Sequence, residues 1–208
     1  MADAHFDKCV FINCPLDEEY EPILQAVLFC IIYSGFSPRL STERNDSGEN
    51  RLSKIRSLIE NSKYSIHDLS RCKAKSVGEY YRMNMPFELG IDYSYRHYSR
   101  AGRSKKILIL AEEKYEYQKA LSDIAGFDIK AHEGEYQNAV RKVRNWLSSE
   151  SGIKLEGAAR ILAAYADFQQ WHYEEQLRLG FEEDDIQDYP TKELLDAMTK
   201  WVALGKPV

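Results

Sequence analysis

The sequence predicts an α/β fold, a flavodoxin-like sheet of five parallel strands in the order 2-1-3-4-5 with helices on both faces. Between Cys9 and Ser149, short apolar runs alternate with longer amphipathic stretches, which is typical of strands joined by crossover helices. The run Lys106–Ala111 is almost continuously apolar, as expected of a strand that is covered on both faces. Together these features favour a parallel sheet between two helical layers.

The first half of the pattern predicts strands and helices separated by turns. A polar segment with Pro15 and Asp17 follows the first apolar run, and Gly35 marks the end of the next helix, because glycine readily takes the left-handed conformation found there. Apolar residues then recur at helical spacing after Arg51. The expected strands are Cys9–Ile12, Phe36–Ser41 and Tyr64–Asp68, and the expected helices are about Glu19–Tyr33 and Arg51–Asn61.

The second half continues the alternation. Pro86 suits the first turn of a helix, where the missing N–H of proline is not needed. The expected elements are a helix Pro86–Tyr98, a strand Lys106–Ala111, a helix Glu113–Ile124, an extended segment Phe127–Ala131 and a helix Glu135–Ser149.

The strand pattern stops near the end of this region. We expect residues 1–151 to form the α/β domain and residues 152–208 to form a C-terminal helical extension. Its helices are expected at about Glu156–Leu179 and Thr191–Ala203, on either side of an acidic turn region from Glu182 to Asp185. Each helix has an apolar stripe that must be covered. Two alternatives are open: the stripes pack on the α/β domain, or they form an interface with a second copy or a partner protein.

Composition narrows the functional classes. A net charge of −5 without a concentrated basic face argues against direct nucleic-acid binding. The four cysteines (Cys9, Cys14, Cys30 and Cys72) show no metal-ligand spacing and are expected to be reduced thiols. The chain shows neither a membrane-spanning stretch nor a signal peptide. We therefore expect a cytoplasmic protein without membrane contact.

The fold rule for open parallel sheets selects the candidate site residues. Ligands bind in the crevice beyond the carboxyl ends of the strands, where loops of neighbouring units meet. The candidates are Asn13, Pro15, Asp17 and Tyr20 after the first strand, Ser41, Glu43 and Arg44 after the second, Asp68, Ser70 and Arg71 after the third, and Asn84 and Glu88 at the start of the next helix. Arg44 and Arg51 are candidate phosphate contacts.

Two carboxylates in this set could carry chemistry. Glu88 suits glycosidic cleavage, because breaking the bond between a sugar and a nitrogen base passes through a positively charged sugar that a carboxylate can stabilise or attack. The alternative is an ordinary acidic residue that interacts with the helix dipole. Asp68 could hold ribose hydroxyls or accept a proton, but an aspartate at this place is also a common turn former.

Other chemistries lack their motifs. The sequence contains no G-x-S-x-G, H-E-x-x-H or G-x-x-x-x-G-K-[ST] segment, which argues against esterase-type triads, zinc catalysis and P-loop phosphoryl transfer. His67 is a candidate acid or base, or a strand residue that packs against a helix. We expect neither a metal nor a cofactor.

Several of these segments resemble the bacterial TIR-like and nucleoside 2-deoxyribosyltransferase-like group. The resemblance covers about Lys8 to Ser149. It rests on the segments Phe11–Pro15, Asp17, Tyr20, Gly35-Phe36, Asp68–Ser70 and Met85–Gly90. One departure is the bulky segment Arg82–Pro86, where the group has a small, Gly-containing approach; this leaves the choice of substrate open.

The resemblance implies a function and roles for the site residues. Glu88 would be the catalytic glutamate, Asp68 would assist at the sugar, and the remaining candidates would bind the substrate. The chain would then be a nucleotide N-glycosidase that cleaves NAD or a related nucleotide, as an effector of antiphage defence that works as a homo-oligomer or with a defence-system partner. The alternatives are a nucleotide sensor without catalysis and a TIR-type self-association module.

Overall fold

A computed structural model describes residues 5–44, 46–71, 74, 77–78, 80, 82–187 and 189–205. Its five strands form one parallel sheet in the order β2-β1-β3-β4-β5. This confirms the predicted α/β, flavodoxin-like architecture. The strands are β1 (Cys9–Asn13), β2 (Ser37–Arg39), β3 (Tyr64–Asp68), β4 (Lys106–Ala111) and β5 (Lys130–Ala131).

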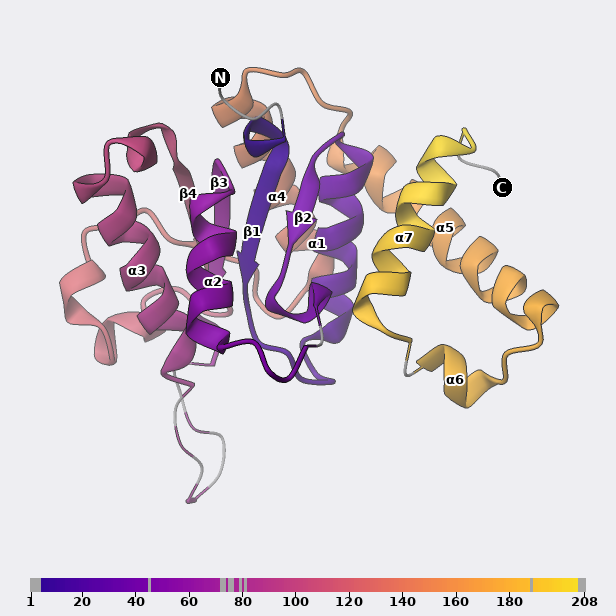
Figure 1. Ribbon diagram of the computed structural model, residues 1–208, viewed down its shortest axis with the longest axis horizontal. Coiled ribbons are helices and arrows are strands. Elements are labelled where there is room, and N and C mark those ends of the chain that lie inside the picture. Colours follow the sequence, from indigo (N-terminus) through magenta and orange to yellow (C-terminus); the bar gives the residue numbers. More distant parts are fainter. Residues whose placement is uncertain are drawn as a thin grey trace.

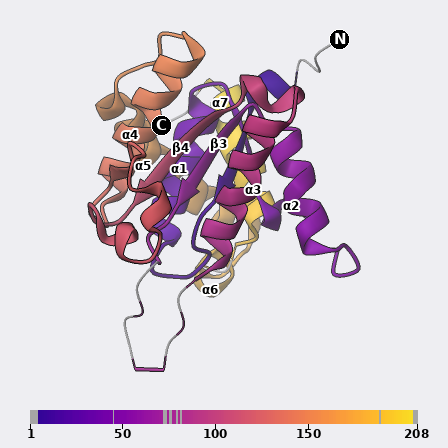
Figure 2. The same ribbon diagram turned by 90° about the vertical axis from the view of Figure 1, so that its left-hand side faces the viewer.

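Helices cover both faces of the sheet. The α-helices are α1 (Glu21–Tyr33), α2 (Arg51–Glu60), α3 (Asn84–Tyr98), α4 (Tyr136–Ser151), α5 (Ala158–Leu179), α6 (Glu183–Gln187) and α7 (Thr191–Ala203). Short 3₁₀ turns lie at Phe6–Lys8, Ser41–Glu43, Ala101–Ser104, Glu116–Lys119 and Ser122–Ile124. Helices α2 and α3 lie on one face, and α1 and α4 lie on the other (Figures 1 and 2).

Successive side chains of a strand contribute to the core on opposite faces of the sheet. Val10 and Ile12 of β1 belong to the cluster under α1 and α4, whereas Phe11 packs with Ile55 and Leu58 of α2. This follows from the two-residue period of a strand, which points successive side chains to opposite faces. All five residues of β1 and of β3 are buried, so both strands lie in the centre of the molecule.

The connection between β4 and β5 differs from the prediction. The expected helix Glu113–Ile124 is wrong, because the segment forms only the two 3₁₀ turns Glu116–Lys119 and Ser122–Ile124. Tyr115 has a φ of 68°, and Leu121 has a φ of −136°; neither value fits an α-helix. Only Lys130 and Ala131 of the expected strand Phe127–Ala131 pair with β4.

The C-terminal helices α5 and α7 pack against α1. Phe29 of α1 lies at the centre of this contact, with its ring 5.3 Å from that of Tyr165, 5.4 Å from Phe168 and 5.6 Å from Trp201. Helix α1 is therefore covered by α4 on one side and by α5 and α7 on the other. This explains why its apolar residues extend around most of the helix and are not confined to one face. The acidic region expected as a turn contains the short helix α6, whose first turn is acidic.

Among the described residues, no helix combines the length and the apolar character that crossing a membrane requires.

Candidate functional site

Polar side chains gather at the carboxyl edge of the sheet. Asp68 ends β3, Asn13 ends β1, and His132 follows β5 directly. These three residues are 0 to 4% exposed. Because all strands run in the same direction, their carboxyl ends meet at one edge, and the fold places these buried polar groups there. They form two hydrogen-bonded clusters, one on each side of the sheet.

The first cluster is centred on Asp68. Tyr20 Oη donates to Asp68 Oδ2 at 2.7 Å, and His132 Nε2 lies 3.0 Å from the same oxygen. The Ser70 N–H donates to Asp68 Oδ1 at 2.9 Å, and Ser70 Oγ donates to it as well. Four donors thus converge on one buried carboxylate. We call Tyr20, Asp68, Ser70 and His132 the Asp68 cluster.

These hydrogen bonds hold Asp68 in its ionised form. Burial alone raises the pKa of Asp68, but the hydrogen bonds from His132, Ser70 and Tyr20 outweigh it and lower the pKa below its ordinary value. Asp68 is therefore an acceptor at neutral pH and does not supply a proton.

The orientation of His132 excludes an acyl-transfer triad. The Gly134 N–H donates to His132 Nδ1 at 3.2 Å, so that Nε2 carries the proton. Nε2 faces both Asp68, at 3.0 Å, and Ser70 Oγ, at 2.9 Å. In a Ser-His-Asp triad the two partners contact opposite nitrogens of the imidazole. The cluster therefore positions polar groups and does not activate Ser70 as a nucleophile.

Glu88 lies in the first two turns of α3, at the same edge of the sheet. Glu88 is 6% exposed, and among the described residues it forms an ion pair with Arg51, with 3.7 Å between Arg51 Nη2 and Glu88 Oε1. Within the described part of the chain, no hydrogen bond saturates the carboxylate. Burial raises the pKa of Glu88, and the charge of Arg51 only partly offsets this effect. Glu88 thus differs from Asp68, whose pKa is lowered.

A second cluster fixes the helix that carries Glu88. Asn13 Nδ2 donates to the Met85 carbonyl at 2.9 Å and lies 2.9 Å from His67 Nδ1. His67 Nε2 lies 3.0 Å from Asp92 Oδ2, and Lys105 Nζ lies 3.2 Å from Asp92 Oδ1. Since a carboxamide nitrogen only donates, His67 Nδ1 accepts and Nε2 donates to Asp92.

This second cluster anchors α3 on both sides of Glu88. Met85 precedes Glu88 by three residues and Asp92 follows it by four, which is one helical turn in each direction. Lys105 Nζ also donates to the carbonyls of Ile59, at 2.7 Å, and Ser62, at 2.5 Å, at the end of α2. His67 is therefore a structural residue that joins the sheet to α3.

Cys14 directly follows β1, and its thiol is not a nucleophile. The side chain is 7% exposed. Burial raises the pKa of the Cys14 thiol well above its ordinary value, and the charges of Asp68, Glu88 and Asp17 raise it further. A thiol of this kind stays protonated at neutral pH. The catalytic candidate at this edge is therefore a carboxylate.

Asp17 occupies the loop between β1 and α1 and is held by an arginine. It accepts from Arg71 Nη2 at 2.9 Å, and Arg71 also pairs with Glu19 and Glu112. The hydrogen bond from Arg71 lowers the pKa of Asp17, against the opposing effect of burial. Arg71 thus ties the loops after β1, β3 and β4 together.

The other predicted site residues are distributed around this edge. Ser41 Oγ lies 3.5 Å from Arg51 Nη1, so the loop after β2 is joined to Glu88 through Arg51. Arg44 pairs with Glu49 at 3.2 Å and has no contact with either cluster. Pro15 is buried in the loop after β1, and Asn84 is exposed at the first position of α3. Cys72 lies outside the described residues.

Sequence reasoning missed His132, Asp92 and Lys105. His132 follows the expected strand Phe127–Ala131 directly, so the same strand-end rule that selected Asp68 could have selected it. Asp92 lies four residues after Glu88, and i, i+4 spacing places both on one face of a helix. The sequence did not indicate that Lys105 is buried, because a lysine before a strand is usually exposed.

Within the described part of the chain, no group of three or more His, Cys, Asp or Glu side chains is arranged to hold a metal ion. No protein-family model, curated protein or solved structure matches this chain. The class that the coordinates define is therefore a flavodoxin-like α/β fold with two buried polar clusters at the carboxyl edge of its sheet.

Proposed function

We propose that this chain is an enzyme that cleaves the N-glycosidic bond of a nucleotide, with Glu88 as the catalytic carboxylate. The observation that carries the proposal is the contrast between two buried carboxylates at one edge of the sheet. Asp68 is saturated by four donors, whereas Glu88 has only a 3.7 Å ion pair with Arg51 and a raised pKa. A carboxylate with unused hydrogen-bonding capacity and a perturbed pKa is typical of a reacting group.

The reaction assigns Glu88 a defined role. The bond between C1′ of the sugar and the nitrogen of the base breaks, and its electron pair leaves with the base. Positive charge develops on the sugar, and the ionised Glu88 carboxylate stabilises this charge or bonds to C1′. Water then attacks C1′ and forms the new C–O bond. Where Glu88 has bonded to C1′, that bond breaks at this step and its electron pair returns to the carboxylate. The proton lost by the water passes to the departed base or to solvent. The weak 3.7 Å contact with Arg51 leaves the carboxylate free to face the sugar.

The Asp68 cluster supports the site by positioning. Both oxygens of Asp68 are already occupied by Tyr20, Ser70 and His132, which favours a role in holding these side chains over direct contact with ribose. The Tyr20 and Ser70 oxygens keep lone pairs that can accept from sugar hydroxyls. Asp68 therefore acts through the residues around it.

Arg51 is the candidate phosphate contact of this site. It is the first residue of α2, and its side chain is 60% exposed although it lies close to the buried Glu88. A guanidinium in this position can bind a phosphate oxygen while the sugar faces Glu88. Arg44, whose side chain is 47% exposed, offers a second cation next to α2, because Lys54 of α2 donates to its carbonyl.

The resemblance to the TIR-like and deoxyribosyltransferase-like group favours NAD as the substrate. It also suggests a cytoplasmic effector of antiphage defence that acts as a homo-oligomer or with a defence-system partner.

The test is release of free base from a panel of nucleotides. Purified protein at high concentration is incubated with NAD and with common nucleosides and nucleotides, and released base is measured by chromatography. Glu88→Gln removes the charge with little change of shape, and Glu113→Gln, an exposed glutamate after β4, is the matched control. We expect base release by the wild type and the control, and a loss of about a hundredfold or more in Glu88→Gln. Equal rates in all three proteins would contradict the assignment.

A nucleotide sensor is the second candidate, and the saturated Asp68 cluster is the observation that favours it. Internal hydrogen bonds already use the oxygens of Asp68, as expected of a rigid binding surface. A sensor predicts that a nucleotide raises the unfolding temperature while no base is released. Base release that depends on Glu88 would exclude this candidate.

A further inference from the structure

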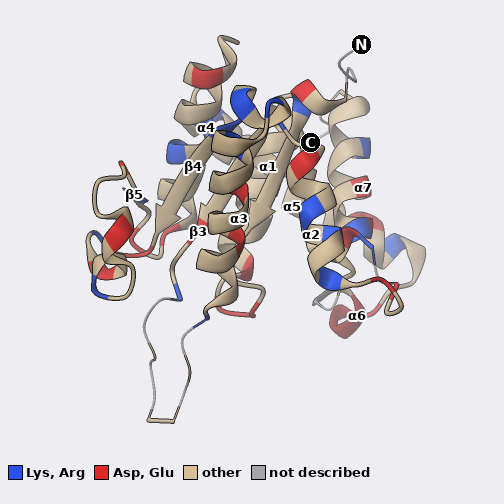
Figure 3. Ribbon diagram, turned by 60° about the vertical axis from the view of Figure 1, so that its left-hand side comes forward, with Lys and Arg blue, Asp and Glu red and all other residues tan. Residues whose placement is uncertain are grey.

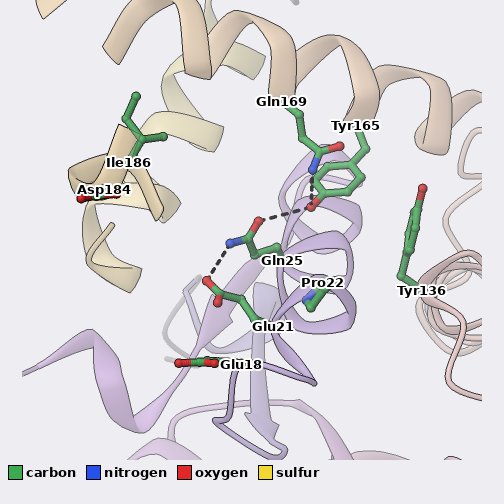
Figure 4. Close-up of a pocket in the computed structure, with 9 residues that line it drawn as sticks. All are labelled: Glu18, Glu21, Pro22, Gln25, Tyr136, Tyr165, Gln169, Asp184 and Ile186. Carbon is green, nitrogen blue, oxygen red and sulfur yellow. Dashed lines mark hydrogen bonds between the residues drawn. The ribbon is translucent and has the colours of Figure 1, made fainter. Parts of the chain in front are cut away.

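A separate cavity lies between the α/β body and the C-terminal helices. Its volume is about 820 Å³, within the range of small-molecule sites. Residues of α1, α4, α5 and α6 and of the loop before α1 line it (Figure 4). Glu88 and the Asp68 cluster are not among the lining residues. An inference about this cavity is therefore independent of the proposed function.

Three carboxylates line the cavity, and no lysine or arginine is among the described residues that line it. Glu18 lies in the loop before α1, Glu21 is the first residue of α1, and Asp184 belongs to the short helix α6. Figure 3 shows the acidic residues of α6 in red. Among the described residues, none of the three is paired with a lysine or arginine. Within the described segments, the hydrogen bond that Glu21 accepts is a neutral one, from Gln25 Nε2 at 2.9 Å. Uncompensated negative charge around a cavity attracts a cation.

A buried phenol in the same wall makes two long hydrogen bonds, donating to Gln25 and accepting from Gln169. Tyr165 is 5% exposed, yet its hydroxyl lies 3.5 Å from Gln25 Oε1 and 3.3 Å from Gln169 Nε2. Both distances exceed those of good hydrogen bonds, which are 2.5–3.0 Å for a hydroxyl donor and about 3.0 Å for an amide donor. Figure 4 shows the Tyr165 hydroxyl beside both carboxamides. The Tyr165 and Gln25 oxygens can therefore accept N–H groups of a ligand.

The lining also suits the rest of such a ligand. Tyr136 and Tyr165 offer aromatic faces, which attract ammonium groups. Pro22 and Ile186 offer apolar surface, on which a methylene chain can pack. The carboxylates do not converge on one point in the way that a metal ion requires, since the described residues contain no such group. A cation with its charges spaced along a chain matches this arrangement better than a point charge.

We propose that this cavity binds a linear aliphatic polyamine, with its ammonium groups at Glu18, Glu21 and Asp184 and one N–H group at the Tyr165 hydroxyl. The methylene segments lie between Pro22 and Ile186. The ligand joins the start of α1 to α5 and α6, and so stabilises the C-terminal helices against the α/β body.

The test is calorimetric titration of the full chain with spermidine. Sodium chloride and magnesium chloride at equal ionic strength are the reference titrations, because general screening by salt would act in all three. We expect saturable binding of one spermidine per chain and no comparable heat from either salt. Glu21→Gln and Asp184→Asn each remove one carboxylate, and each weakens binding about tenfold. Asp167→Asn on the exposed face of α5 is the matched control and leaves binding unchanged.

Circular dichroism of each variant shows whether it is folded, and Asp184→Asn, on a short surface helix, keeps the test decisive if Glu21→Gln unfolds. No saturable heat with spermidine would overturn the proposal. Equal binding of magnesium, or equal weakening by Asp167→Asn and Asp184→Asn, would overturn it as well, because the charge would then act without a defined site.

Discussion

The buried ion pair between Asp92 and Lys105 gives the sharpest prediction about stability. Both side chains are 0% exposed, and the charged atoms are 3.2 Å apart. Burial lowers the pKa of Lys105, which shows the cost of burying its charge, and Asp92 offsets part of this effect. In Asp92→Asn the lysine keeps its two carbonyl partners but loses its counter-ion. We expect a loss of about 3–5 kcal/mol in the free energy of unfolding, a large part of the 5–15 kcal/mol of a typical domain.

The assay is urea unfolding of four proteins: the wild type, Asp92→Asn, Lys105→Met and the double variant. Tryptophan fluorescence follows the transition. Since the two residues contact each other, the double variant should lose less than the sum of the single losses, by at least about 1 kcal/mol. A loss below about 1 kcal/mol in Asp92→Asn, or strict additivity, would refute the account of this cluster as a coupled anchor of α3.

Three further predictions concern single residues. Asp68→Asn lowers stability at neutral pH, and the difference from wild type shrinks as pH falls through the lowered folded-state pKa of Asp68, measured by urea unfolding across pH. Glu88→Gln raises the unfolding temperature at neutral pH, because burial in the folded state disfavours the ionised carboxylate that the variant lacks. This gain in unfolding temperature disappears as the pH falls from the raised pKa of folded Glu88 to about 4.3, the usual pKa of a glutamate in an unfolded chain. Trp201→Ala, at 1% exposure, costs about 3–5 kcal/mol in urea unfolding; a loss below about 1 kcal/mol would contradict the packing of α7 on α1.

The sheet could be predicted from the sequence because its signals are local. The apolar run Lys106–Ala111 and the helical repeat after Arg51 each lie within a few turns of chain, and the connection rules of parallel sheets then leave few topologies. The helix Glu113–Ile124 was predicted wrongly. Its composition permits a helix, but the left-handed conformation of Tyr115 interrupts it, and no local pattern marks that residue.

The polar clusters were harder to predict because they depend on contacts between distant segments. The positions of Tyr20, Asp68 and Ser70 after strands predicted that all three belong to the site, and the structure brings them into direct contact. His132, 64 residues after Asp68, joins them only when β5 pairs with β4. The pairing of Lys105 with Asp92 depends on how α3 packs on β3, which no single segment of the sequence encodes.

The proposed reaction depends on the Glu88 carboxylate, which would break the glycosidic bond of a nucleotide. The most direct test is the rate of nicotinamide release from NAD by the wild type and by Glu88→Gln under identical conditions. We predict measurable release by the wild type and a loss of about a hundredfold or more in the variant. Release at the same rate by both proteins would contradict it, because the reaction would then proceed without the carboxylate.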